Sequence, residues 1–569
     1  MNPPTVQKSM ADSPLGRWGV VLLVSITIAT CYYFYDAISP LKGTLTSELG
    51  WDSADYGQFR SAYAWPNVFL LMAVIGGVIA DKMGIRITGN FFVSSMVVGA
   101  FLTWYGATDY FNGGGLGHAF MSSFLSGWSP SLKMMWLGFL LYGFGAETSI
   151  VIISKVIVKW FRGREVALAL AINLALARLG SMMGLVVSPR VLQPDWTTAL
   201  WLCFVLMVIG LLAWVMYTFV DVRFERQRSM VGAVEGDEEE PEEPFRFSDL
   251  TKLITNPSFL FIILLCVTFY SAVFPFMNYA PDLLVNKWGM SLTRASDISS
   301  IMYFGTIFFT PFFGWVIDFR GWGASLMVVG SAMLVGVHLI FALTTVNPLI
   351  PMFLLGMTFS LVPAAMWPAI AKIVGDNRLG TAYGLTFSVQ NIGLYLFPIL
   401  IGLVLDGTNP GVATAQAASA QLGEARSAVV EILGEEERGI FDVPKAPLTT
   451  EEKKELLEVA REAAQSFSEP DEAANALAAD LIEPYATRYR EARLIAAEFA
   501  VDATLENVDQ QRRELEKADL GAVYNYTPAI LMLALLGIAG MVFAVLLKRA
   551  DRIQGYGLDL PSKQKGDKN

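Results

Sequence analysis

The chain has 569 residues, of which 54% are hydrophobic, with a net charge of −11 and a mean hydropathy of +0.47. This composition is too apolar for a soluble protein of such length and predicts an all-α polytopic membrane protein. The three cysteines lie inside apolar segments without a CxxC pair, and the two histidines are far apart. The sequence therefore suggests no disulfide framework, metal site or cofactor. Without a nucleotide loop or a catalytic triad, neither an enzyme nor direct ATP drive is expected.

Twelve apolar segments have the length of about 20 residues that a bilayer requires. Their expected limits are 18–38, 57–80, 86–107, 134–158, 166–188, 198–220, 257–280, 296–317, 324–345, 348–372, 381–404 and 526–548. No cleavage site follows the first segment, so we expect it to remain a membrane helix. Most Lys and Arg residues of the short loops fall on one side, which predicts that both termini are cytoplasmic.

These spans predict seven parts along the chain. They are a cytoplasmic tail (1–17), a six-helix N-terminal half (18–220), an acidic cytoplasmic linker (221–256), helices seven to eleven (257–405), an insert (406–525), helix twelve (526–548) and a cytoplasmic tail (549–569). The linker combines low hydrophobicity with clustered charge, which is typical of a flexible segment.

The insert at 406–525 carries most of the acidity of the protein. It holds 25 acidic and 12 basic residues, a net charge of 12 − 25 = −13, which leaves +2 for the remainder. Its Ala- and Glu-rich pattern predicts a small helical domain on the outer side. A disordered acidic loop is the alternative. We expect the insert to cap the outer ends of the spans and to steer cationic solutes.

Two short patterns recur in the two halves of the chain. The first is Gly77-x-x-x-Asp81-x-x-Gly84, echoed by Gly314-x-x-x-Asp318-x-x-Gly321; the second is Ala177-Arg178-Leu179-Gly180, echoed by Gln390-Asn391-Ile392-Gly393. Six spans followed by six more, related by a parallel repeat, resemble the layout of the major facilitator superfamily. The expected fold is therefore that of this superfamily, with a helical insert between helices eleven and twelve.

The first pattern predicts a gate at the cytoplasmic side. Its N-terminal copy continues with Lys82 and Arg86, and Asp81 lies at a helix end where it can pair with basic groups or a helix N-terminus. Such a contact would hold one conformation and release the other; an ordinary charged loop is the alternative. In the second copy Phe319 replaces the basic residue beside Asp318, so we expect two gates of unequal strength.

Single ionisable residues interrupt spans four and five near their middle. Glu147 and Arg178 would each cost about 2.5–3.5 kcal/mol to place at bilayer depth, so a functional role is expected. A carboxylate suits an ammonium group, and a planar guanidinium suits a carboxylate. We therefore predict that the two residues hold a zwitterionic solute in a central cavity; the alternative is that they pair only with each other.

Asp36 closes the expected outer end of span one. Its carboxylate is a candidate gate contact or proton carrier. From the sequence we favour a third interpretation, in which Asp36 is a charge at the helix end that faces water.

Several segments together resemble the lysosomal dipeptide transporters of the major facilitator superfamily. They are residues 63–67, 145–147, 177–181, 272–276, 367–368, 379–384 and 390–393. The resemblance covers nearly all spans and fails in the insert. It implies facilitated transport of dipeptides down a gradient, with the aromatic residues Trp367, Phe274, Tyr63 and Trp65 walling side-chain pockets. Asn391 occupies the repeat position of Arg178 and is expected to hydrogen-bond the peptide amide.

Two other functions stay open. The first is a proton-coupled transporter of another small organic anion or zwitterion; the second is a non-transporting receptor or assembly platform that uses the insert. No nucleic-acid partner is expected, and an accessory subunit of the kind that animal relatives use would be replaced by the insert. The N-terminal tail lacks an acidic dileucine signal, which favours a bacterial plasma membrane over a lysosomal one.

Overall fold

A computed structural model describes residues 13–161, 165–230, 253–374, 379–413, 416 and 523–561. Within these ranges all regular structure is helical, and eleven helices are long and apolar enough to cross a membrane. The all-α fold class is confirmed. The helices expected inside the insert lie outside the described residues.

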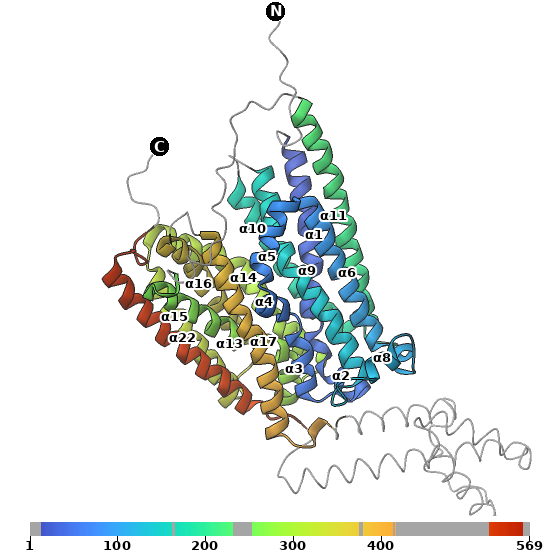
Figure 1. Ribbon diagram of the computed structural model, residues 1–569. Coiled ribbons are helices and arrows are strands. Elements are labelled where there is room, and N and C mark those ends of the chain that lie inside the picture. Colours follow the sequence, from blue (N-terminus) through green and yellow to red (C-terminus); the bar gives the residue numbers. More distant parts are fainter. Residues whose placement is uncertain are drawn as a thin grey trace, which may run out of the picture. The chain divides into compact units, whose positions relative to one another are not determined.

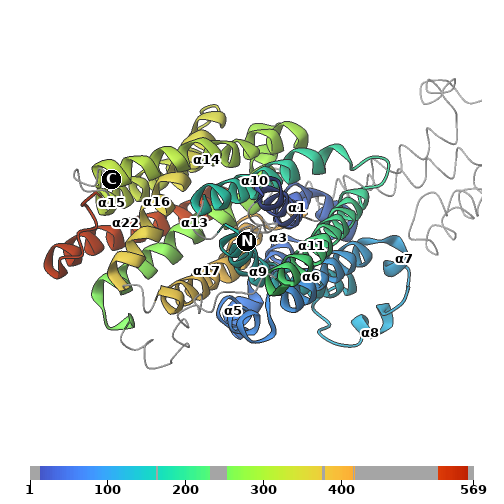
Figure 2. The same ribbon diagram turned by 90° about the horizontal axis from the view of Figure 1, so that it is seen from above.

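The N-terminal half is built from five long helices. They are α1 (Pro14–Ala37), α6 (Ile85–Ala107), α9 (Pro130–Trp160), α10 (Val166–Val187) and α11 (Thr198–Met230). α1 packs against α10 and α11, and α6 packs against α9 (Figures 1 and 2). The short helices of this stretch include η2 (Ser39–Leu41), α2 (Lys42–Leu49), α7 (Asp109–Asn112), α8 (His118–Ser122) and η3 (Ser188–Arg190).

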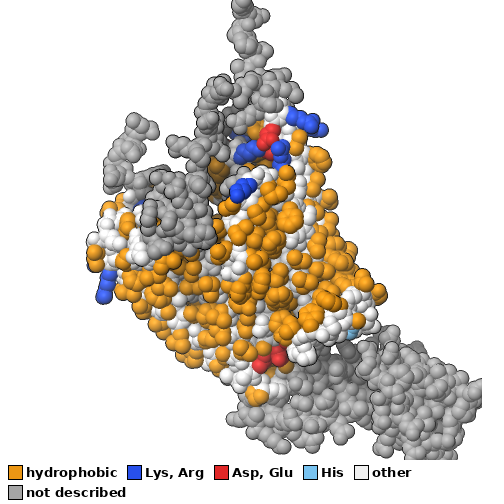
Figure 3. Space-filling model, viewed as in Figure 1, with side chains coloured by type: hydrophobic (Ala, Val, Ile, Leu, Met, Phe, Trp, Pro, Cys, Tyr) orange, Lys and Arg blue, Asp and Glu red, His pale blue; other side chains and the backbone are white. Residues whose placement is uncertain are grey.

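Six long helices form the C-terminal half. They are α13 (Pro257–Trp288), α14 (Leu292–Arg320), α15 (Gly323–Leu343), α16 (Leu349–Val374), α17 (Leu379–Thr408) and α22 (Thr527–Gln554). α13 packs against α14 and α22, while α15 packs against α16 and α22. Apolar side chains cover the flank of the bundle, as a bilayer requires, and Lys and Arg side chains gather near one end (Figure 3).

The bundle has two ends, which we call the terminal end and the insert end. At the terminal end α1 begins and α22 stops, and at the insert end α17 stops and α22 begins (Figure 1). The start of α1 and the end of α22 therefore lie at the same end of the bundle.

The second expected span, 57–80, is broken rather than continuous. It consists of α3 (Ser53–Ser61), α4 (Trp65–Leu70) and α5 (Met72–Met83). Pro66 lacks the N–H that a continuing helix needs, and Leu71 adopts a left-handed φ of 52°. Asn67 Oδ1 accepts a hydrogen bond from the Ala73 N–H at 2.8 Å, which satisfies one free donor at the start of α5.

The expected linker starts later than the sequence predicted, because α11 continues to Met230. Its last turns carry Asp221 and Glu225, whose carboxylates lie 3.0 and 2.8 Å from Lys159 Nζ. Arg86 Nη2 lies 2.7 Å from the other Glu225 oxygen. These ion pairs fix α11 to α6 and α9, so residues 221–230 belong to the folded half.

The second repeated pattern has the same packing role in both halves. A Cβ on Gly180 would lie 2.1 Å from the Ala29 carbonyl oxygen, and one on Gly393 would lie 1.7 Å from Ser271 Oγ. These glycines let α10 approach α1 and let α17 approach α13. Arg178 and Asn391, two residues earlier, therefore occupy equivalent places in the two halves.

Candidate substrate site

Glu147 lies on α9 against the break in the second span. Tyr63, at that break, donates its hydroxyl to Glu147 Oε1 at 2.7 Å. A Cβ on Gly143 would lie only 2.2 Å from the Tyr63 carbonyl oxygen, so the glycine permits this approach. Discontinuous membrane helices commonly line binding sites, because their irregular backbone is tolerated only beside protein or a cavity.

Arg178 lies on α10 between aromatic rings of both halves. Its Cζ is 5.5 Å from the centre of the Tyr32 ring and 5.2 Å from the centre of the Phe359 ring. Within the described part of the chain, its buried Nη1 has no hydrogen-bond partner. The rings stabilise the positive charge through their faces and leave guanidinium donors available for an anionic group.

Glu147 and Arg178 form no ion pair with each other among the described residues. Arg178 lies over the Tyr32 ring of α1, whereas Glu147 accepts from the Tyr63 hydroxyl, and both side chains are half-buried. An acid and a base that are held by different partners match a solute that carries an ammonium and a carboxylate. The alternative of a purely structural pair finds no support in this arrangement.

Two of the aromatic residues that we expected to line the substrate pocket, Phe274 and Trp367, are connected to Arg178 by ring contacts through Phe359. The Phe274 ring centre lies 5.3 Å from that of Phe359, and the Tyr270 ring centre lies 5.9 Å from it. Trp367 Nε1 donates to the Tyr270 hydroxyl at 3.1 Å. Sequence reasoning missed Phe359 and Tyr270, since aromatic residues are frequent in every span.

Asn391 presents an acceptor beside these rings. Its side chain is 1% exposed; Nδ2 donates to the Phe387 carbonyl at 3.0 Å, whereas Oδ1 has no partner among the described residues. The Phe387 ring stacks on Trp367 with centroids 4.6 Å apart. An unsatisfied buried acceptor is costly, and Oδ1 is chemically able to accept a hydrogen bond from a bound solute.

Trp65 lies in a different cluster from these groups. Its ring packs at 5.0 Å from Phe69 and 6.4 Å from Trp136, centre to centre. Those contacts place it against the neighbouring helix α9 and the short helix α4, and the structure does not bring it to Arg178 or Glu147.

The expectation that Asp36 faces water is wrong. The residue is 2% exposed, and its Oδ1 accepts a hydrogen bond from the Tyr303 hydroxyl at 2.7 Å. Tyr303 lies on α14, so this buried contact joins the two halves. A carboxylate tolerates such burial only with hydrogen-bond partners.

Further contacts between the halves lie at the insert end, and sequence reasoning missed them. Arg60 on α3 donates to Asn278 Oδ1 on α13. One turn further along α13, Asp282 pairs with Lys42 at 2.9 Å and accepts from the Tyr526 hydroxyl. Asn278 and Asp282 are four residues apart and therefore share one face of α13.

Two more contacts between the halves lie at this end. Tyr56 donates to the Asn278 carbonyl at 2.8 Å, and Arg190 makes two bonds of 2.8 Å to the carboxylate of Asp297. The halves are thus joined at the insert end by a series of polar contacts. No local pattern marks them in the sequence, because each pair comes from segments more than 100 residues apart.

The N-terminal gate pattern has the expected turn. Gly84 ends α5 with φ 83°, which favours glycine, and a Cβ on Gly77 would lie 4.0 Å from Val151 Cγ1. Arg86 pairs with Glu225 inside the same half, and Lys82 is exposed. The side chain of Asp81 lies outside the described residues, so its gate role stays a prediction.

In the C-terminal copy, Asp318 is exposed and Gly314 has open space around it. Gly321 has φ 77°, and a Cβ there would lie 2.3 Å from the Asp559 carbonyl oxygen. The Asp559 carboxylate accepts from the Ser325 N–H at 2.9 Å, near the start of α15. The carboxylate at this helix N-terminus is therefore supplied by the C-terminal segment rather than by Asp318.

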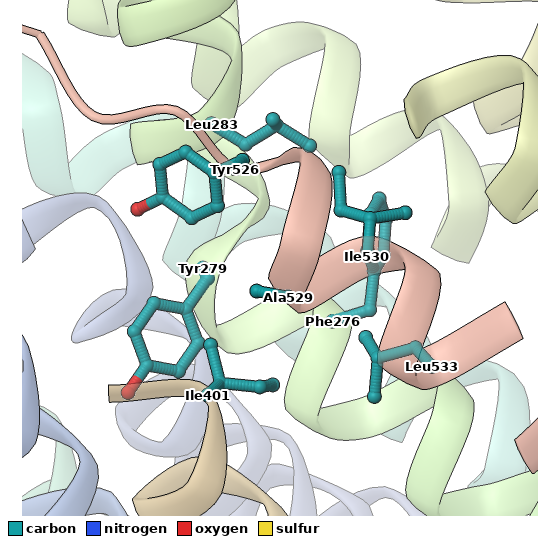
Figure 4. A pocket seen from close by; sticks show the side chains of 8 residues that line it. All are labelled: Phe276, Tyr279, Leu283, Ile401, Tyr526, Ala529, Ile530 and Leu533. Atoms are coloured by element: carbon teal, nitrogen blue, oxygen red, sulfur yellow. The ribbon is translucent and has the colours of Figure 1, made fainter. Parts of the chain in front are cut away.

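A small apolar pocket lies apart from Glu147 and Arg178, between α13, α17 and α22 (Figure 4). It is lined by Phe276, Tyr279, Leu283, Ile401, Tyr526, Ala529, Ile530 and Leu533. These side chains offer the hydroxyls of two tyrosines and no charge, so the pocket does not suit a zwitterion.

Comparison with known proteins agrees with this architecture. The chain is 29% identical over 399 residues to the lysosomal dipeptide transporter MFSD1 of Homo sapiens, which covers 68% of this chain and 79% of the relative. The corresponding protein of Danio rerio is 28% identical over 391 residues, covering 66% and 77%. Both proteins are named as transporters.

Solved structures show the same fold at low identity. The nucleoside transporter NupG has a TM-score of 0.51 at 16% identity, covering 68% of this chain and 91% of that one. A bacterial homologue of the human lysosomal transporter Spinster also has a TM-score of 0.51, at 13% identity, covering 95% and 98%. The family model of the Major Facilitator Superfamily matches residues 24–398, and the chain therefore belongs to this superfamily of membrane transporters.

Proposed function

We propose that the protein transports small peptides, dipeptides in the first place, as a facilitated uniporter. The observation that carries this proposal is the separate placement of Glu147 and Arg178, neither neutralised by the other. The names of the MFSD1 relatives support the same substrate class.

A dipeptide carries the two charges that this site complements. Its ammonium group would bind the Glu147 carboxylate, and its carboxylate would bind the free Arg178 donors by charge-assisted hydrogen bonds. The unpaired Oδ1 of Asn391 would accept from the peptide N–H. The rings of Phe274, Phe359 and Trp367 would pack against the substrate side chains.

Transport requires the two ends of the site to open in turn. In the described conformation the halves are joined at the insert end by Arg60, Lys42 and their partners on α13. At the terminal end, the ion pairs of Arg86 and Lys159 stay within the N-terminal half. We assign this conformation as closed at the insert end, so substrate would exchange from the terminal end.

The test is binding and uptake by purified protein in proteoliposomes. Glu147→Gln and Arg178→Ala should each lose dipeptide binding, since truncating one partner of a desolvated charge contact costs about 2–5 kcal/mol. Asp109→Asn and Arg294→Ala, exposed charges outside the site, serve as matched controls and should bind normally. Normal uptake by both site variants at normal expression would overturn the assignment, and uptake that requires a proton gradient would favour the proton-coupled alternative.

The membrane and its orientation belong to the same proposal. The insert end would face the outside and both termini the cytoplasm, because Lys and Arg concentrate in the loops of the terminal end. Labelling of an exposed engineered cysteine in intact cells would decide the orientation.

A further inference from the structure

The connection between α6 and α9, residues 108–129, is long, and specific hydrogen bonds and apolar contacts hold it in place. Lys133 on α9 is 5% exposed and donates its ammonium to the carbonyls of Met121, at 2.6 Å, and Phe124. Phe111, Met121 and Met134 form a small buried core beneath it. A buried ammonium is costly unless its hydrogen bonds are made. The two carbonyl groups of the loop are therefore held at Lys133.

This loop presents apolar side chains to its surroundings. Tyr110, Leu116, Phe120 and Leu125 are 68%, 82%, 68% and 62% exposed. Over the whole loop the only acidic or basic side chains are Asp109 and His118. Exposed apolar clusters of this kind mark contact with a membrane or a partner.

The apolar surface of the loop continues the lipid-facing side of α6. Phe101, exposed on α6, stacks on Tyr105 with ring centres 5.8 Å apart, and Tyr105 lies 6.2 Å from Tyr110 in the loop. The Tyr105 hydroxyl also donates to the Leu116 carbonyl at 3.0 Å. Figure 2 shows α7 and α8 at the periphery of the N-terminal half, outside α6.

We propose that the 108–129 loop inserts its apolar side chains into the lipid interface of the leaflet at the insert end. The continuous aromatic row favours lipid, because Tyr and other aromatic rings are preferred at headgroup depth. A loop without Lys or Arg offers no attraction for anionic headgroups. The contact is therefore apolar and independent of lipid charge. It anchors α6 and α9, and so the helix that carries Glu147, against the membrane.

The test uses a fluorophore on a single engineered cysteine, since the native Cys31, Cys203 and Cys266 are buried. Phe120→Cys in the full-length protein is labelled and reconstituted in vesicles that contain lipids with nitroxides at different depths. We expect emission shifted to shorter wavelength, and quenching that is strongest with nitroxides near the headgroup. Neither result should change with salt or with the fraction of anionic lipid.

Thr345→Cys, exposed on the connection between α15 and α16 at the same end, is the matched control and should be quenched less. Adding Leu116→Ser and Leu125→Ser to the Phe120→Cys protein should reduce its quenching. Emission typical of water, with quenching no stronger than at residue 345, would overturn the proposal and leave a protein partner as the reason for the exposed surface.

Discussion

The ion pair between Lys42 and Asp282 offers the most direct test of closure at the insert end. The two charged atoms are 2.9 Å apart, and the side chains are 1% and 8% exposed. Lys42 follows η2 in the N-terminal half, and Asp282 lies on α13 in the C-terminal half. Opening this end would separate and hydrate both groups, so the cost of truncating one of them falls on the closed state.

The structure gives the size and the order of the effects. Breaking a buried pair by removing one partner costs about 3–5 kcal/mol, which corresponds to a shift of about 100- to 5,000-fold toward the open state. Asp282→Ala removes both the ion pair with Lys42 and the hydrogen bond from Tyr526. Lys42→Ala removes the ion pair and leaves Asp282 with the hydrogen bond from Tyr526, so its shift should be the smaller one.

Distances between spin labels at Gln193→Cys and Thr345→Cys, both exposed and on opposite halves, report the state of the insert end. The parent protein should give a short distance, and Asp282→Ala should add a longer one. Lys42→Met combined with Asp282→Leu should restore most of the short distance, since apolar replacement of a buried pair is often tolerated. An unchanged distribution in Asp282→Ala would refute the reasoning.

Three further predictions follow from the packing, the gate pattern and the insert. Gly180→Ala should lower the free energy of unfolding by about 1–3 kcal/mol through overpacking, whereas Gly336→Ala, which meets no atom within 4 Å, should not; equal thermal stability in detergent would contradict this. Asp81→Asn should slow uptake with little change in equilibrium binding, because it acts on the conformational equilibrium; a large loss of affinity would make Asp81 a ligand instead. Replacing 408–522 with a short Gly/Ser linker should reduce uptake of Lys-containing dipeptides more than of neutral ones, and only at low salt; identical rates and salt dependence would exclude steering.

The sequence by itself determined the class of the protein and the places of its main charges. Runs of about 20 apolar residues have few structural solutions in a bilayer, so eleven of the expected spans appear as helices. Glu147 and Arg178 stand out because an ionisable residue in such a run is expensive wherever it lies. The repeat could also be recognised in the sequence, since Gly180 and Gly393 each permit a close contact between two helices, one in each half.

Only the tertiary structure decided which of the other polar groups matter. The break around Tyr63 depends on Gly143 of another helix, which admits the irregular backbone. The burial of Asp36 depends on Tyr303, which lies 267 residues away in the sequence. The pairing of Lys42 with Asp282 likewise joins halves that no local periodicity relates. Hydrophobic length is a property of one segment, whereas the partner of a buried charge is set by which helices pack together.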